Sequence, residues 1–164
     1  VITALAVASR AAFYLIPQVK PISAVVIVAG ICFGAKEGFF IGAASAFVSN
    51  ILFGQGIWTP FQMIALGFVG LFAGMIFKKI KASNMGLSIA GFLLCSLVYG
   101  LIVDLSSVFT MLSDFSFNSI VTLYAAAIPF NLTFGVSTAV FLFVFGKAFI
   151  KKIERIKTKY GLFQ

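Results

Sequence analysis

Long apolar runs, separated by short polar stretches, make up nearly the whole chain of 164 residues. The runs cover residues 1–15, 22–33, 38–53, 61–77 and 85–103, and a sixth run ends near residue 150. A helix of roughly 20 apolar residues crosses the hydrocarbon core of a bilayer. No run alternates with the period of two that a membrane β-barrel requires. The pattern predicts an all-α membrane protein, a bundle of about six transmembrane helices in a single integral domain over residues 1–164.

The start of the sixth helix is the least defined part of this pattern. Residues 107–120 mix Ser, Asp, Asn and Phe, and we interpret them as a long loop or interfacial turn after a fifth span closed by Asp104. The apolar stretch 121–149 contains Pro129 and is too long for one crossing. We expect its first part to be a tilted or interfacial extension of the sixth span. A short seventh crossing is the alternative.

Composition agrees with a membrane location. Hydrophobic residues make up 62% of the chain and charged residues 10%, whereas soluble domains average about 25% charged residues. Cys32 and Cys95 lie inside apolar runs, so we expect two buried free thiols. The chain begins at Val1 without a methionine, already inside an apolar run, and we expect a short N-terminal piece to precede it.

The basic residues predict the orientation. Ten of the twelve lie between spans two and three, between spans four and five, or after span six: Lys36, Lys78, Lys79, Lys81, Lys147, Lys151, Lys152, Arg155, Lys157 and Lys159. With six spans these regions share one side, which the positive-inside rule makes cytoplasmic. Both termini are then cytoplasmic and residues 147–164 form a basic cytosolic tail. The outer loops are residues 16–21, 54–60 and 104–120.

Residues 54–62 are unusual because polar and conformationally special residues gather there between two long apolar runs. Glycine permits backbone angles that other residues avoid, and proline fits the first turn of a helix. We interpret the stretch as a shaped outer loop at the mouth of a membrane-embedded pocket. Its candidate ligand-binding residues are Gln55, Gly56, Trp58, Thr59 and Gln62.

Five further residues are candidates for the pocket wall: Arg10, Tyr14, Gln18, Asn50 and Asn131. A cation inside an apolar span usually faces a polar interior, although Arg10 could instead reach the headgroups. Tyr14, Gln18 and Lys20 surround the first outer turn, where interfacial anchoring is the alternative role. The two asparagines either line the pocket or bond a neighbouring helix.

Small residues recur every four positions in several spans, for example Ala4, Ala8 and Ala12 in span one and Gly70 and Gly74 in span four. Such stripes let helix backbones approach closely. Packing within this chain is the expected role of most of them. The alanine stripe reaches the cytoplasmic end of span one, where it could receive a helix of a partner protein.

Catalytic chemistry has no candidate residues. The chain has no histidine, and its only acids are Glu37, Asp104, Asp114 and Glu154, none in the middle of a predicted span. Acid–base pairs, metal sites and hydrolytic triads therefore lack their groups, and no phosphate-binding P-loop is present. We expect no enzyme activity, no metal and no cofactor in this chain. Uphill transport would take its energy from another subunit.

Taken together, these residues resemble the S components, the substrate-binding membrane subunits of energy-coupling factor (ECF) vitamin transporters. The resemblance covers nearly the whole chain and includes the six-span plan and the Ala4–Ala8 pattern. Residues 53–63, 9–12 and 154–162 are most similar to the group assigned to cobalamin uptake. The chain departs from that group at Ile57, where a proline is expected, and at Phe61, where a second tryptophan is expected.

The resemblance implies a mechanism and partners. An S component in a bacterial plasma membrane binds a vitamin at its outer face, docks on a transmembrane coupling subunit through the alanine stripe, and topples to carry the ligand inward. Two cytosolic ATPase subunits bind ATP and power the cycle. Cobalamin is the favoured ligand. The alternatives are riboflavin, pantothenate or a queuosine precursor, or a structural membrane subunit that binds no ligand.

Overall fold

The computed structural model describes residues 1–78, 83–111 and 116–160, and all regular structure in these residues is helical. The first four helices are α1 (Ile2–Ala12), α2 (Ile22–Phe33), α3 (Ala35–Phe53) and α4 (Trp58–Phe77). A fifth helix runs from α5 (Asn84–Leu93) through a π-helical segment (Leu94–Tyr99) into α6 (Gly100–Met111). A sixth runs from α7 (Phe117–Phe141) through a second π-helical segment (Leu142–Gly146) into α8 (Lys147–Tyr160). The predicted all-α bundle of six spans is confirmed.

The lengths of the helices suit a membrane. Three of them are long and apolar enough to cross a bilayer, Trp58–Phe77, Asn84–Met111 and Phe117–Tyr160, and Ile2–Ala12 and Ile22–Phe33 are shorter apolar helices. At about 1.5 Å per residue, the second of the long helices measures about 42 Å, more than the roughly 30 Å hydrocarbon core. Its ends therefore reach past the apolar region.

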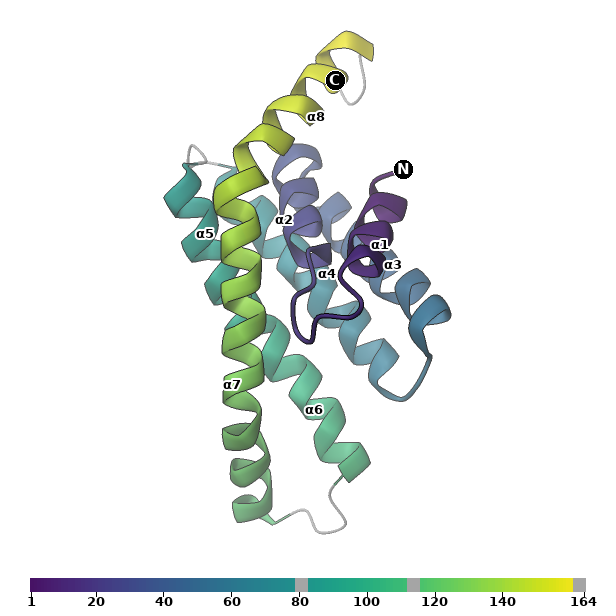
Figure 1. Ribbon diagram of the computed structural model, residues 1–164, viewed down its shortest axis with the longest axis vertical. Helices are drawn as coiled ribbons and strands as arrows, with labels where there is room; N and C mark the ends of the chain where they lie inside the picture. The colour runs from purple at the N-terminus through teal and green to yellow at the C-terminus, as the bar shows by residue number, and fades with distance from the viewer. Residues whose placement is uncertain (79–82, 112–115, 161–164) are drawn as a thin grey trace.

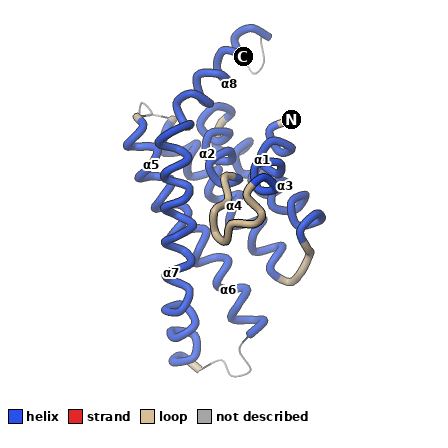
Figure 2. The backbone as a smooth tube through the Cα atoms, in the orientation of Figure 1, coloured by secondary structure: helices blue, strands red, loops and turns tan. Residues whose placement is uncertain are grey.

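Consecutive helices run antiparallel, and the two ends of the bundle differ (Figure 1). The start of α1 and the far end of α8 lie at one end, together with the start of α5. The turn between α3 and α4 and the facing ends of α6 and α7 lie toward the other (Figure 2). This places Lys36, Lys78 and the basic residues of α8 at the end that the charge pattern predicts to be cytoplasmic. Lys79 and Lys81 lie outside the described residues.

The turn before α4 is shorter than the predicted outer loop. The helix begins at Trp58 rather than Phe61, so Thr59 and Gln62 are helical and only residues 54–57 form the loop. Pro60 lies in the first turn, where no N–H is needed. The Thr59 hydroxyl accepts a hydrogen bond from the Gly56 N–H at 3.2 Å and supports this early start.

The prediction of a loop over residues 104–120 is wrong, because α6 continues to Met111 and α7 begins at Phe117. Polar side chains in this stretch are satisfied without leaving the helix. Asp104 accepts a hydrogen bond from the Asn131 Nδ2 at 2.7 Å. Ser106 donates to the carbonyl oxygen of Val103 at 2.6 Å, and Thr110 donates back to the preceding turn in the same way. Asp114 lies outside the described residues.

Other predicted boundaries also moved. Helix α7 passes through Pro129 without a break, so the first part of this stretch extends the sixth helix and forms no seventh crossing, and the helix continues past residue 150 to Tyr160. The first span ends at Ala12 rather than Leu15. The third begins at Ala35 rather than Gly38, directly after Gly34, whose φ of 116° ends α2. Both cysteines are buried and free, as predicted.

Helices α2, α3 and α4 pack closely because glycines line their contacts. A Cβ atom on Gly38 would lie 2.7 Å from the Cα of Gly30 and 2.6 Å from the carbonyl oxygen of Gly70. A Cβ atom on Gly74 would lie 2.7 Å from the Cα of Ala35. Only glycine allows backbones to approach this closely. The prediction that the glycine stripes pack within this chain is confirmed. The three closely packed helices support the turn before α4.

We predict that Gly70→Val lowers the midpoint of thermal unfolding in detergent, because its side chain would overlap the backbone of Gly38 in α3. Overpacking of this kind costs about 1–3 kcal/mol. The matched control is Ala126→Val on the exposed face of α7. Equal midpoints for the two variants would contradict the close approach of α3 and α4.

Candidate functional site

A hydrogen-bond network joins the ends of α1, α3 and α4 next to the turn at residues 54–57. Arg10, in the last turn of α1, donates through Nη1 to the Ser49 Oγ at 2.7 Å and to the Asn50 Oδ1 at 2.9 Å. The Asn50 Nδ2 then donates to the Gln62 Oε1 at 2.8 Å and to the Thr59 Oγ1 at 3.2 Å. Four of the predicted site residues are thus brought together from three helices.

Asn50 is the centre of this network. Its side chain is 1% exposed, and both donor hydrogens and the acceptor oxygen of its amide are used. A buried amide left without partners would cost about 1–3 kcal/mol. The network therefore fixes Arg10 and Gln62 relative to each other at the end of the bundle that the charge pattern predicts to be the outer one. Ser49 was not among the predicted residues; its position one residue before Asn50 on a buried helix face was the available signal.

Aromatic rings extend the network toward the surface. The Arg10 guanidinium carbon lies 5.2 Å from the centroid of the Phe53 ring, within the range of a cation–π contact. The Tyr14 ring stacks on the same Phe53 ring, and the two ring centroids lie 4.8 Å apart. Tyr14 is 61% exposed, so the predicted residue lies at the edge of the site rather than inside it.

The turn at residues 54–57 brings Trp58 over its own backbone. Gly54 has a φ of 116°, which favours glycine. A Cβ atom on Gly56 would overlap the Trp58 indole ring, so glycine is needed there as well. Trp58 remains 44% exposed. Gln55 is exposed too, and its only described hydrogen bond is a long one of 3.5 Å to the carbonyl oxygen of Phe47. Both predicted residues are open to a ligand.

A small polar cavity of about 270 Å³ lies between the end of α1 and the segment that leads to α2. It is lined by Arg10, Tyr14, Ile16, Pro17, Gln18 and Lys20. Gln18 adopts a left-handed backbone with a φ of 59°, which holds this segment in a tight turn. Burial lowers the pKa of Lys20, and the nearby charge of Arg10 lowers it further. Two cations thus border one cavity at the outer end.

Asn131 is not part of this network. It lies on α7 and donates to Asp104 on α6, and both residues line a separate cavity of about 480 Å³ between these helices. Asp104 is 8% exposed. The expectation that Asp104 closes the fifth span is therefore wrong, because the helix runs on to Met111. The apolar residues on both sides of it, Val103 and Leu105, were the signal that the helix continues.

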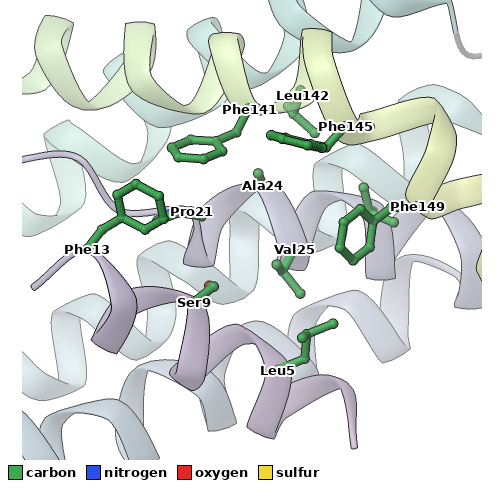
Figure 3. A pocket seen from close by; sticks show the side chains of 12 residues that line it. Leu5, Ser9, Phe13, Pro21, Ala24, Val25, Phe141, Leu142, Phe145 and Phe149 are labelled. Atoms are coloured by element: carbon green, nitrogen blue, oxygen red, sulfur yellow. The ribbon is translucent and has the colours of Figure 1, made fainter.

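A third cavity lies on the other side of α1, between it, α2 and the end of α7, and encloses about 280 Å³. Its lining is apolar, with Phe13, Val25 and Phe141 around it (Figure 3). Ser9 is its one hydroxyl, and this group already donates to the carbonyl oxygen of Ala6 at 2.7 Å. The cavity therefore offers little to a polar ligand.

The alanine stripe lies on the surface. Ala4, Ala8 and Ala12 are all exposed, whereas Ala6 and Val7 on the opposite face of α1 are buried. The stripe is therefore free to meet another helix. Among residues 1–78, 83–111 and 116–160, no group of three or more potential metal ligands occurs.

The comparisons with known proteins point to a transporter subunit. A family model described as "ECF-type riboflavin transporter, S component" matches residues 1–151. The searches of curated proteins and of solved structures gave no match.

We predict that Asn50→Leu lowers the thermal midpoint by roughly 4–8 °C, since about 2 kcal/mol is lost when Arg10 and Gln62 lose their shared partner. Adding Arg10→Met should restore part of this loss, because the unpaired cation is then removed. Fluorescence of Trp58, the one tryptophan in the chain, reports unfolding at this end. The control is Asn118→Leu on the exposed start of α7. Strictly additive effects of the two network changes would contradict the coupling.

Proposed function

The chain belongs to the family of ECF-type riboflavin transporter S components, and on that premise we propose that it captures a vitamin at its non-cytoplasmic face, beside residues 54–62. An S component is the substrate-binding membrane subunit of a vitamin transporter, and it is an integral membrane protein rather than an enzyme. The site residues and the ligand of this chain are the parts that we add.

One observation carries the proposal: the Arg10–Asn50–Gln62 network joins three helices beside the turn at residues 54–57 and includes the partly buried cation of Arg10. Polar and charged groups inside membrane proteins are costly and usually serve a function. Ligand sites combine an apolar wall with a few well-placed polar groups. Here Tyr14 and Trp58 supply exposed aromatic surface beside the network, and Gln55 adds an exposed amide. A planar vitamin ring could stack on these rings while its polar groups meet Arg10 and Gln62.

Two ligands are the leading candidates. Cobalamin is favoured by the similarity of residues 53–63, 9–12 and 154–162 to the cobalamin group of S components. Riboflavin is favoured by the description of the matching family. A structural subunit without a ligand would leave the buried cation of Arg10 and its network without a purpose beyond packing.

Delivery would use the exposed face of α1. Ala4, Ala8 and Ala12 present a smooth strip on which a helix of a coupling subunit can lie closely. The S component then topples and carries the ligand inward, while two partner ATPases bind and hydrolyse ATP. No cofactor is assigned to this chain. The large apolar residues that cover its surface, such as Phe40 and Phe143, allow it to rotate within lipid.

We predict that the purified protein binds cobalamin or riboflavin with a saturable change in Trp58 fluorescence and a matching calorimetric titration. Arg10→Ala should weaken this binding at least about tenfold, because a hydrogen bond from a charged donor contributes about 1.5–3 kcal/mol. Lys151→Ala on α8 is the control and should bind as the wild type does. If no vitamin of a full panel binds, the proposal fails, and the structural role is favoured.

We predict that Ala8→Trp abolishes copurification with the coupling subunit and the two ATPases but leaves vitamin binding intact, because the indole would hold the partner helix away from α1. Ala126→Trp, at an exposed position of α7, is the matched control and should copurify normally. Loss of assembly in the control alone would move the docking surface from α1 to α7.

A further inference from the structure

Two cationic side chains meet at one outer cavity. Arg10 comes from the last turn of α1, and Lys20 from the segment just before α2. Both line the cavity of about 270 Å³ next to residues 54–62, and both are only partly exposed. Elsewhere in the described residues, basic side chains lie mainly at the opposite end of the bundle. This pair is therefore the exception to the charge pattern that orients the chain.

Neither cation is neutralised by an acid in the part of the chain that the structure describes. Arg10 donates to the neutral oxygens of Ser49 and Asn50, and the Lys20 ammonium has no hydrogen bond or ion pair within residues 1–78, 83–111 and 116–160. The described acids are engaged or located elsewhere. Asp104 accepts from Asn131, while Glu37 and Glu154 lie on the first turn of α3 and on α8, at the other end of the molecule.

Two partly buried cations at one cavity form an arrangement that is costly by itself. Burial removes part of the water that would stabilise each charge, and the two charges repel each other. The depressed pKa of Lys20 reflects both effects. An anion placed between them would remove the repulsion and gain charge-assisted hydrogen bonds from both. The Tyr14 hydroxyl and the Gln18 amide, which also line the cavity, offer further donors.

We propose that Arg10 and Lys20 form an anion subsite, which binds a phosphate or carboxylate group of the captured ligand. This proposal rests on the proposed function and adds a chemical requirement for the substrate. The cavity is smaller than the roughly 300–1,000 Å³ of whole ligand pockets, so it holds one group of the ligand and leaves the remainder beside Trp58 and Gln62.

The subsite separates the candidate ligands by charge. Riboflavin carries no ionised group at neutral pH, whereas cobalamin carries a phosphodiester and pantothenate a carboxylate. The two cations therefore favour a vitamin of the second kind. A phospholipid headgroup of the outer leaflet has the same chemistry, so the experiment must tell the two sources apart.

The test measures dissociation constants in neutral detergent for three pairs that differ in one anionic group: cobinamide phosphate and cobinamide, pantothenate and panthenol, and flavin mononucleotide and riboflavin. We expect the anionic member of the binding pair to bind at least about tenfold more tightly. Lys20→Gln should abolish that preference and Lys20→Arg should keep it. The control is Lys36→Gln at the opposite end, which should change nothing. We avoid Arg10 here because its loss also disturbs the network.

The outcomes are distinct. If the protein binds both vitamins of a pair with equal affinity, and Lys20→Gln does not change these affinities, the subsite is overturned and the proposed function stands. If no vitamin binds, the proposed function fails, and the subsite is tested with inorganic phosphate instead. The anion site stands if phosphate raises the thermal midpoint of the wild type and this rise is lost in Lys20→Gln. If phosphate does not raise the midpoint, the subsite is overturned.

A separate experiment tests whether the bound anion is a lipid headgroup. Nanodiscs of phosphatidylcholine are compared with nanodiscs that also contain phosphatidylglycerol. Unchanged affinity for the anionic vitamin supports the ligand assignment. Competition by phosphatidylglycerol that disappears in Lys20→Gln, together with no preference between the paired ligands, assigns the cations to a lipid headgroup and overturns the proposal.

Discussion

The absence of water from the hydrocarbon core of a bilayer is the constraint on which this structure depends. A polar group inside the bundle is stabilised by a partner on the protein, and several of these pairings hold two or more helices together. Asn50 joins α1, α3 and α4, and Asp104 and Asn131 join α6 and α7. Deep in the core, Ser23 and Thr138 lie 2.7 Å apart and join α2 to α7.

The glycine contacts and the polar contacts have different roles in the bundle. Glycines bring α2, α3 and α4 so close that no side chain fits between them, so this side of the bundle is closely packed. The network around Asn50 lies on this closely packed side. Helices α6 and α7 instead leave a cavity of about 480 Å³ between them. The proposed ligand site therefore lies on the closely packed side of the bundle, and the cavity between α6 and α7 is separate from it.

The end of the bundle that is predicted to be cytoplasmic is stabilised by a different contact. Lys157 on α8 donates to the carbonyl oxygen of Cys32 at 2.5 Å and lies 5.4 Å from the centroid of the Phe33 ring. This bond satisfies a carbonyl at the end of α2, where the helix has no further N–H to offer, and a cation is favoured there by the helix dipole. One lysine of the basic tail therefore stabilises the fold, while its neighbours on α8 stay exposed.

The sequence by itself determined the helical membrane class, the number of spans and the arrangement of charges, because these follow from the length of apolar runs and the cost of moving charge across a bilayer. It also indicated Arg10, Asn50, Thr59 and Gln62 as polar residues in unusual places. Only the tertiary structure decided that these four share one network and that Asn131 belongs to Asp104 instead. It also decided that residues 104–111 are helical. The reason is that the hydrogen-bond partners of Asn50, Asp104 and Asn131 lie on other helices, and a pairing between distant parts of the chain is not visible in the local sequence.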